Sequence, residues 1–104
     1  MQISTLYTTQ RTLKRAHQIP EMLKNVETLP LICLSRHPDG LIQIENGHHS
    51  VVAIFLSGRT YLKREEYVLI EEPKKPRERC GLLTGLIEAV LVNWAETIPL
   101  RKTA

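Results

Sequence analysis

The stretch of this sequence best suited to chemistry is Asn46-Gly47-His48-His49-Ser50, where two of the four histidines stand side by side after a glycine. Histidine titrates near neutral pH, so it can act as a general acid or base or donate a hydrogen bond to an anion. If a helix begins here, its first amides have no partner within the helix, and the helix dipole adds partial positive charge. Gly47 permits a tight turn and a close approach of a ligand. The turn therefore predicts a phosphate site formed by Gly47, His48, His49 and Ser50, with His48 and His49 as candidate catalytic groups.

The sequence around this turn predicts the elements that must position it. Two runs rich in leucine and isoleucine flank His37-Pro38-Asp39-Gly40, a strong turn sequence, and predict a β-hairpin. The run that begins at His48 and ends near Gly58 predicts a short buried helix. We expect Val52, Phe55 and Leu56 of this helix to lie in the core. The run "EYVLIE" then predicts a third strand.

The two ends of the chain predict further helices. Apolar residues at helical spacing near the N-terminus predict a helix that Pro20 interrupts and that restarts at Pro20 or Glu21. Residues 80–97 predict a last helix, apolar on more than one face, which either completes the core or covers a second copy in a homo-oligomer such as a dimer. The apolar positions are Leu13, Ala16, Met22, Leu23 and Val26 in the first helix and Leu83, Ile87, Val90, Leu91 and Trp94 in the last.

Length and composition limit the class of protein. A chain of 104 residues is too short for two cores, so we expect a single domain over residues 1–104. Two cysteines without metal-ligand spacing and the lack of a run of about 18 apolar residues predict a cytoplasmic protein without a membrane partner. The predicted fold class is α+β: a small mixed sheet, a buried helix after the Gly-His-His turn and an apolar C-terminal helix.

Basic residues elsewhere are candidates for contacts with phosphate. Arg36 precedes the hairpin turn, and Arg59, Lys63 and Arg64 follow the predicted buried helix. Residues 72–79 form a basic linker that is either solvated or in contact with a nucleic-acid backbone. Its four cations are Lys74, Lys75, Arg77 and Arg79.

The histidines are also open to two other interpretations. A metal site built from His37, Asp39, His48 and His49 is disfavoured, because adjacent residues on a helix point about 100° apart, so no metal ligand is predicted. The turn is also compatible with an ordinary strand-to-helix connection that carries two capping or solvated histidines.

Residues 31–70 resemble the ParB/sulfiredoxin superfamily. The resemblance rests on "RHPDG" between two strands, on "NGHHSVVA" at the turn into the helix, and on "LSG" at the end of that helix. It implies a ParB/sulfiredoxin-like fold in which the glycine turn cradles nucleotide phosphates. In different branches of the superfamily this turn serves nucleotide-switched DNA clamping, DNA cleavage, small-molecule phosphorylation or repair of over-oxidised cysteine.

Departures from the family pattern narrow the range of functions that the resemblance implies. The sulfiredoxin branch has a cysteine where this chain has His48, which argues against that redox chemistry. Ser50 stands where the family has an arginine, and serine cannot make the bidentate hydrogen bonds that arginine makes with phosphate. We therefore expect a domain that binds the phosphate of a nucleotide or nucleic acid, as a DNA-associated nuclease or an accessory factor. A nucleotide and magnesium are candidate cofactors. The alternatives are a small-molecule phosphotransferase and a non-enzymatic interaction module with a degenerate site. If the histidines contact the phosphate, binding should strengthen as pH falls through roughly 6.5.

Overall fold

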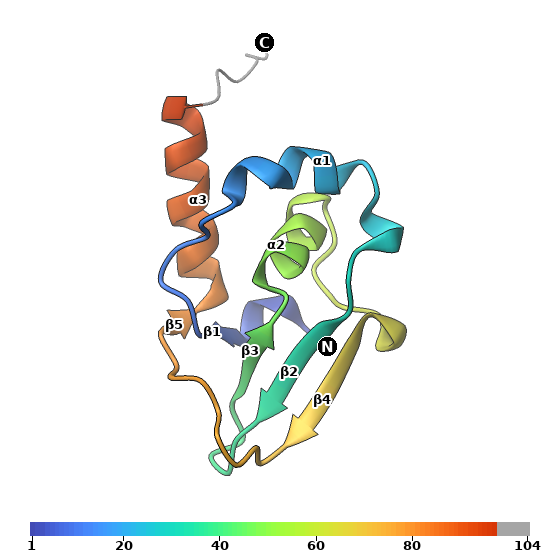
Figure 1. Cartoon of the computed structure of the whole chain (residues 1–104), viewed down its shortest axis with the longest axis vertical. Helices are drawn as coiled ribbons and strands as arrows, with labels where there is room; N and C mark the ends of the chain where they lie inside the picture. The colour runs from blue at the N-terminus through green and yellow to red at the C-terminus, as the bar shows by residue number, and fades with distance from the viewer. Residues whose placement is uncertain (98–104) are drawn as a thin grey trace.

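The chain forms one five-stranded mixed sheet and three α-helices in the computed structural model, which describes the backbone of residues 1–97 and the side chains of residues 1–92 (Figure 1). The strand order is β4-β2-β3-β1-β5, so the predicted α+β class and mixed sheet are confirmed. The strands are β1 (Leu6–Thr8), β2 (Ile32–Arg36), β3 (Ile42–Asn46), β4 (Tyr67–Glu71) and β5 (Gly81–Leu82). The helices are α1 (Ile19–Leu23), α2 (His48–Leu56) and α3 (Leu83–Thr97), and short 3-10 turns cover Ile3–Thr5, Ala16–Gln18, Val26–Thr28 and Arg64–Glu66.

The predicted hairpin is the centre of the sheet. Strands β2 and β3 pair antiparallel, and their turn is closed by a 2.8 Å hydrogen bond from the amide of Gly40 to the carbonyl of His37. Gly40 has φ +86°, a left-handed conformation that glycine adopts without strain. The carboxylate of Asp39 accepts the amide of Leu41 at 3.0 Å, as turn aspartates commonly do. This turn sends the chain back along β3 directly into the Gly47 turn.

Helix α2 begins at His48, as predicted, and packs its middle into the core. Val52 and Ile54 are fully buried, whereas Phe55 and Leu56 are only half-buried against the core. The prediction that Phe55 and Leu56 lie in the core is therefore too strong. Because α2 has one end at the surface, its last turn covers the core without being enclosed by it.

The N-terminal and C-terminal elements differ in part from the predictions. Helix α1 begins at Ile19, one residue before Pro20. The residues before it, Ala16–Gln18, form a 3-10 turn and not the first part of a longer α-helix. Helix α3 begins at Leu83 because residues 81–82 pair with β1 as strand β5. Neither β1 nor β5 is predicted by the sequence pattern. In α3 the predicted stripe residues Leu83, Ile87 and Val90 are buried. The side chain of Trp94 lies outside the described residues.

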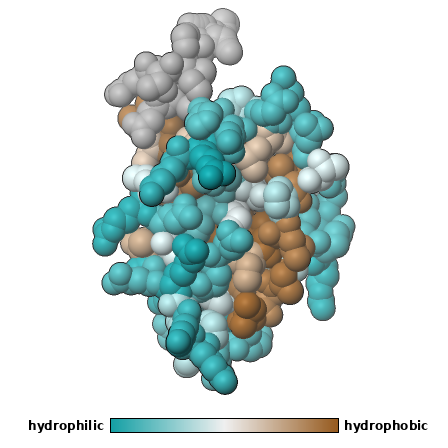
Figure 2. All heavy atoms as spheres, in the orientation of Figure 1, coloured by the Kyte–Doolittle hydropathy of each residue, from teal (hydrophilic) through white to brown (hydrophobic). Residues whose placement is uncertain are grey.

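The outer face of β4 is open to solvent. In Figure 2 a brown, hydrophobic area lies over β2 and β4, within a surface that is otherwise mostly hydrophilic. Val68 and Ile70 of β4 are exposed, whereas Tyr67 and Leu69, which alternate with them, pack against the core. Among the described residues no helix is long and apolar enough to cross a membrane.

Candidate functional site

A cavity of about 810 Å³ lies at the N-terminus of α2 and includes the whole predicted turn. Gly47 is the residue that precedes the helix, with φ +100°, and no side chain caps the first amides. These amides belong to His48, His49 and Ser50, and all three residues line the cavity. The other lining residues are Gln10, Arg11, Thr12, Lys14, Arg15, Gln18, Met22, Pro30, Leu31, Asn46 and Arg77.

The charge on the walls of this cavity is positive. Four of its lining residues are cationic, and none is an aspartate or a glutamate. Arg11, Lys14 and Arg15 belong to the segment between β1 and α1, whereas Arg77 belongs to the basic segment after β4. Four cations around an uncapped helix N-terminus favour an anion in the cavity.

The paired histidines hold the N-terminal segment over this cavity. The Nε2 atom of His48 accepts a hydrogen bond from the amide of Thr9 at 3.1 Å, and that of His49 accepts one from the amide of Arg15 at 3.2 Å. Both contacts join α2 to a segment more than thirty residues earlier in the chain. The histidines therefore place Arg11, Lys14 and Arg15 at the cavity, a role that sequence reasoning missed.

Both histidines are held in the neutral form. Burial and the nearby charges of Arg77 and His49 together lower the pKa of His48 from 6.5 to about 4, against the opposing effect of the Glu45 carboxylate. Burial, together with the charges of Arg15 and His17, also lowers the pKa of His49. Because the Nε2 atom of His48 accepts a hydrogen bond, its single ring proton is on Nδ1. That atom is buried and has no hydrogen-bond partner among the described residues.

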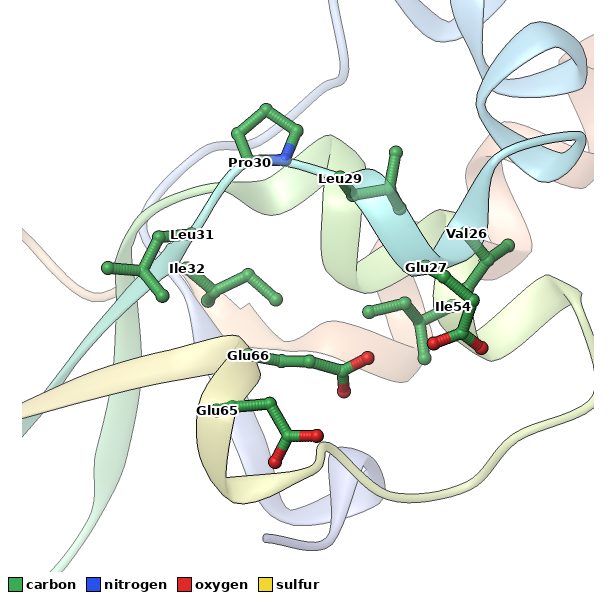
Figure 3. Close-up of a pocket in the computed structure, with 9 residues that line it drawn as sticks. All are labelled: Val26, Glu27, Leu29, Pro30, Leu31, Ile32, Ile54, Glu65 and Glu66. Carbon is green, nitrogen blue, oxygen red and sulfur yellow. The ribbon is translucent and has the colours of Figure 1, made fainter.

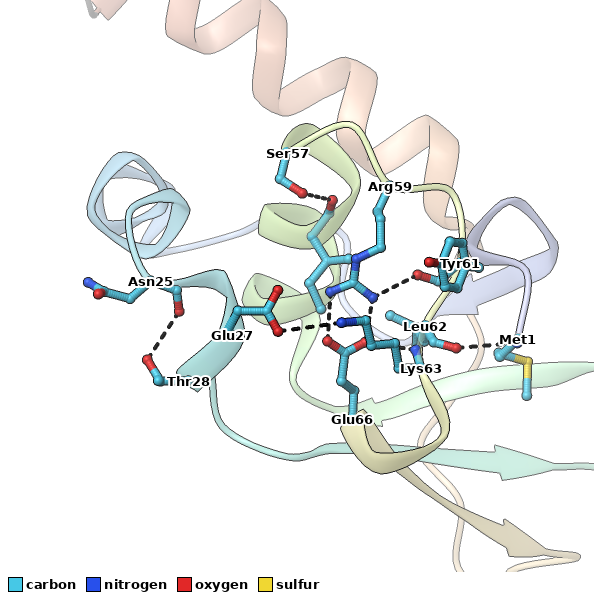
Figure 4. A network of polar contacts seen from close by, with 11 residues as sticks. Met1, Asn25, Glu27, Thr28, Ser57, Arg59, Tyr61, Leu62, Lys63 and Glu66 are labelled. Atoms are coloured by element: carbon cyan, nitrogen blue, oxygen red, sulfur yellow. Dashed lines mark hydrogen bonds and ion pairs between the residues drawn. The ribbon is translucent and has the colours of Figure 1, made fainter.

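Two arginines that the sequence assigned to the phosphate site lie elsewhere. Arg36 pairs with Glu71 of β4 at 3.1 Å. Arg59 makes a bidentate pair with Glu66, with both N–O distances at 2.7 Å (Figure 4). Lys63, in the same network, lies 3.5 Å from Glu27. Neither arginine lines the cavity at Gly47, so the structure does not bring these candidates together with the turn.

The four cations of the basic segment lie in different surroundings. Lys74, Lys75 and Arg77 are all exposed, and Arg77 also lines the cavity at Gly47. Arg79 pairs with Asp39 at 3.2 Å and lies 5.3 Å from the centre of the Tyr7 ring. Of the four, only Arg77 is brought to the predicted turn.

A second, smaller cavity of about 280 Å³ has the opposite charge. Figure 3 shows the carboxylates of Glu27, Glu65 and Glu66 beside the apolar side chains of Ile32 and Ile54. Two of these carboxylates already have partners, because Glu66 binds Arg59 and Glu27 binds Lys63. Its acidic rim disfavours a phosphate, so this cavity does not compete with the one at Gly47.

Comparisons of the chain with models of protein families, with curated proteins and with solved structures find no match. The function must therefore be inferred from the chain's own residues. Cys33 and Cys80 are free thiols. Within the described part of the chain no three His, Cys, Asp or Glu side chains gather closely enough to hold a metal ion.

Proposed function

We propose that this chain binds the phosphate of a nucleotide or of a nucleic acid in the cavity at Gly47, as a DNA-associated nuclease or accessory factor of the ParB/sulfiredoxin type. The observation that carries the proposal is the lining of the cavity: four cations, no carboxylate and the uncapped first turn of α2. An anion in such a place gains hydrogen bonds from main-chain amides and attraction from the cations.

The order of elements supports the family part of the proposal. Strand β2, the Asp39-Gly40 turn, strand β3, the Gly47 turn, helix α2 and strand β4 follow one another as the resemblance implies. The arginine that the family pattern places at Ser50 is absent. Arg15 and Arg77, which line the same cavity, offer guanidinium groups from other segments in its place.

A second candidate is an enzyme that transfers phosphate to or from a small molecule. It is favoured by the apolar wall that Met22, Pro30 and Leu31 give to the same cavity. A volume of about 810 Å³ also lies within the range of pockets for small molecules, roughly 300–1,000 Å³. In this alternative the phosphate keeps its place at Gly47, and the apolar wall takes the rest of the substrate.

Titration calorimetry with inorganic phosphate, nucleoside triphosphates and a short DNA duplex, each with and without magnesium, tests the proposal. We expect Arg15→Ala and Arg77→Ala to weaken binding about tenfold each, and Ser50→Arg to tighten it. Arg64→Ala is the matched control, because Arg64 is exposed and does not line the cavity.

The DNA arm of this experiment separates the two candidates. If DNA is the ligand, its affinity falls with salt, and Arg77→Ala lowers the slope by roughly one unit per lost phosphate contact. Turnover of a nucleotide without affinity for DNA would favour the transferase. Failure of every phosphate ligand to bind would overturn the proposed function.

A further inference from the structure

Residues 72–80, which we call the strap, connect β4 to β5. These strands are the two opposite edges of the sheet, so the strap must pass from one edge to the other (Figure 1). Both of its ends are fixed by main-chain hydrogen bonds of 2.8 Å. The amide of Glu72 donates to the carbonyl of Arg36, and the amide of Cys80 donates to the carbonyl of Thr8.

The middle of the strap is held at Arg77. Its amide donates to Oε1 of Glu45 at 3.1 Å, and its carbonyl accepts from Nε2 of Gln43 at 2.7 Å. Two side chains of β3 thus bind both the amide and the carbonyl of Arg77. Lys74 and Lys75, three and two positions earlier, are exposed.

The side chains of Gln43 and Glu45 are themselves fixed. The second carboxylate oxygen of Glu45 accepts from the hydroxyl of Ser35 at 2.6 Å and from Nε2 of Gln43 at 2.8 Å. Gln43 and Ser35 are fully buried. The two side chains that hold Arg77 therefore belong to the sheet and not to a surface loop, and Glu45 lies two residues before Gly47.

We infer that Gln43 and Glu45 are positioning residues for anion binding, which fix the main chain of Arg77 so that its side chain lines the cavity at Gly47. The inference rests on the proposed function and adds residues that touch no ligand. An arginine on an unfixed nine-residue connection would have to be ordered each time an anion bound, at an entropic cost. With its main chain held beforehand, Arg77 meets the anion with less of this cost. The effect of the Arg77 charge on the pKa of the neighbouring His48 agrees with this placement.

A double-mutant cycle tests the inference, with inorganic phosphate as the probe and titration calorimetry as the measurement. Glu45→Gln keeps the shape of the side chain and removes one of its two carboxylate acceptors. We expect it to weaken phosphate binding roughly threefold to tenfold in the natural chain, about the net effect of one hydrogen bond. In the Arg77→Ala background the hydrogen bond to the Arg77 main chain no longer matters for affinity, and removal of the Glu45 charge should leave the affinity unchanged or tighten it slightly.

Asp39→Asn is the matched control. Asp39 holds Arg79 of the same strap at 3.2 Å but does not touch Arg77, so its substitution should leave phosphate affinity unchanged. Thermal melting of each variant checks that the fold is intact. Should Glu45→Gln fail to fold, Gln43→Met, which removes the donor to the Arg77 carbonyl, replaces it in the cycle.

The outcomes separate the two proposals. If the natural chain binds no phosphate, the proposed function fails and this inference falls with it. If the chain binds phosphate but the substitution at Glu45 or Gln43 has the same effect with and without the Arg77 side chain, only the positioning role is overturned.

Discussion

The imidazole of His48 accepts the amide hydrogen of Thr9 over 3.1 Å, so a side chain at the start of α2 fixes the end of β1. The contact requires an unprotonated Nε2 atom. His49 makes the equivalent contact with the amide of Arg15. Acid should therefore release the N-terminal segment that carries three of the four cations of the cavity. This reverses the expectation from sequence that acid strengthens anion binding.

Stability should fall as pH drops from about 6.5 to about 4 because of His48. Its pKa is about 4 in the folded chain and near 6.5 when unfolded, so the unfolded state binds more protons in this range. For a basic group whose pKa is lower in the folded state, the contribution to stability is complete above the unfolded pKa of 6.5. It is lost as pH falls toward the folded pKa of about 4. The loss by pH 4.5 should be about 2–3 kcal/mol. Urea unfolding at pH 7 and 4.5 measures it.

His48→Gln is the control for this prediction. Glutamine offers an acceptor for the Thr9 amide but does not titrate, so the dependence of the unfolding free energy on pH should become flatter. An identical dependence in both chains would show that other groups, such as the carboxylates, cause the acid sensitivity.

Gly47→Ala should destabilise the chain more than Gly58→Ala. Both glycines have positive φ, +100° and +106°, so both substitutions strain the backbone by about 1 kcal/mol or more. A Cβ atom at Gly47 would also lie 3.1 Å from Cα of Ile32, whereas one at Gly58 would meet nothing within 4 Å. We expect a total of about 2–3 kcal/mol at Gly47, measured by urea unfolding. Equal losses at the two positions would mean that the contact with Ile32 relaxes freely.

Ile54→Ala should destabilise the chain more than Phe55→Ala, although phenylalanine is the larger residue. Ile54 is 1% exposed and Phe55 is half-buried at the end of α2. Truncation of a buried isoleucine removes about 2–5 kcal/mol, and we expect roughly half of the usual 3–5 kcal/mol for Phe55. Chemical denaturation of the two variants gives the order. The opposite order would place Phe55 inside the core.

Glu66→Gln should remove about 2 kcal/mol, because it breaks a partly buried pair with Arg59. The side chain of Arg59 is 16% exposed and that of Glu66 is 15% exposed. Glu71→Gln is the control, since the Arg36–Glu71 pair is 42% and 62% exposed and should contribute less than about 0.5 kcal/mol. Thermal unfolding at neutral pH compares them. Similar small losses would show that the bidentate geometry at Glu66 adds nothing.

The contribution of the Arg59–Glu66 pair to stability also depends on pH. Hydrogen bonds from Arg59 hold the pKa of Glu66 below its ordinary value of 4.5. A carboxylate with a lowered folded pKa contributes stability above its unfolded pKa and loses it as pH falls through the folded one. Its loss therefore begins only near pH 4.5, where most of the His48 contribution is already lost, so the two can be separated.

The middle of the fold could be predicted because its signals are local. The turn at Asp39-Gly40, the glycine before α2 and the alternating residues of β4 are each contained in a few consecutive positions. Strands β1 and β5 could not be predicted, because two or three residues carry no pattern of their own and their partners are distant in the sequence.

A cavity lies at the turn where the sequence predicts a phosphate site, and most of the cations that line it are not among the predicted residues. Arg36 and Arg59 were chosen for their nearness in sequence to the turn, but Glu71 and Glu66 hold them elsewhere. The cations at Arg11, Lys14 and Arg15 were missed, because contacts between distant parts of the chain bring them to α2, among them the hydrogen bonds to the histidines. Three cations within five positions were the available signal.

The place of β1 between β3 and β5 has a consequence for the order of folding. The β2–β3–β4 part can assemble from segments that are near one another in sequence, whereas β1 must find β3 and then receive β5 over long stretches of chain. Closing long loops is slow, so we expect a nucleus made of the hairpin, α2 and β4. Substitutions in the hairpin would then slow folding, whereas substitutions in β5 or α3 would speed unfolding and leave the folding rate unchanged.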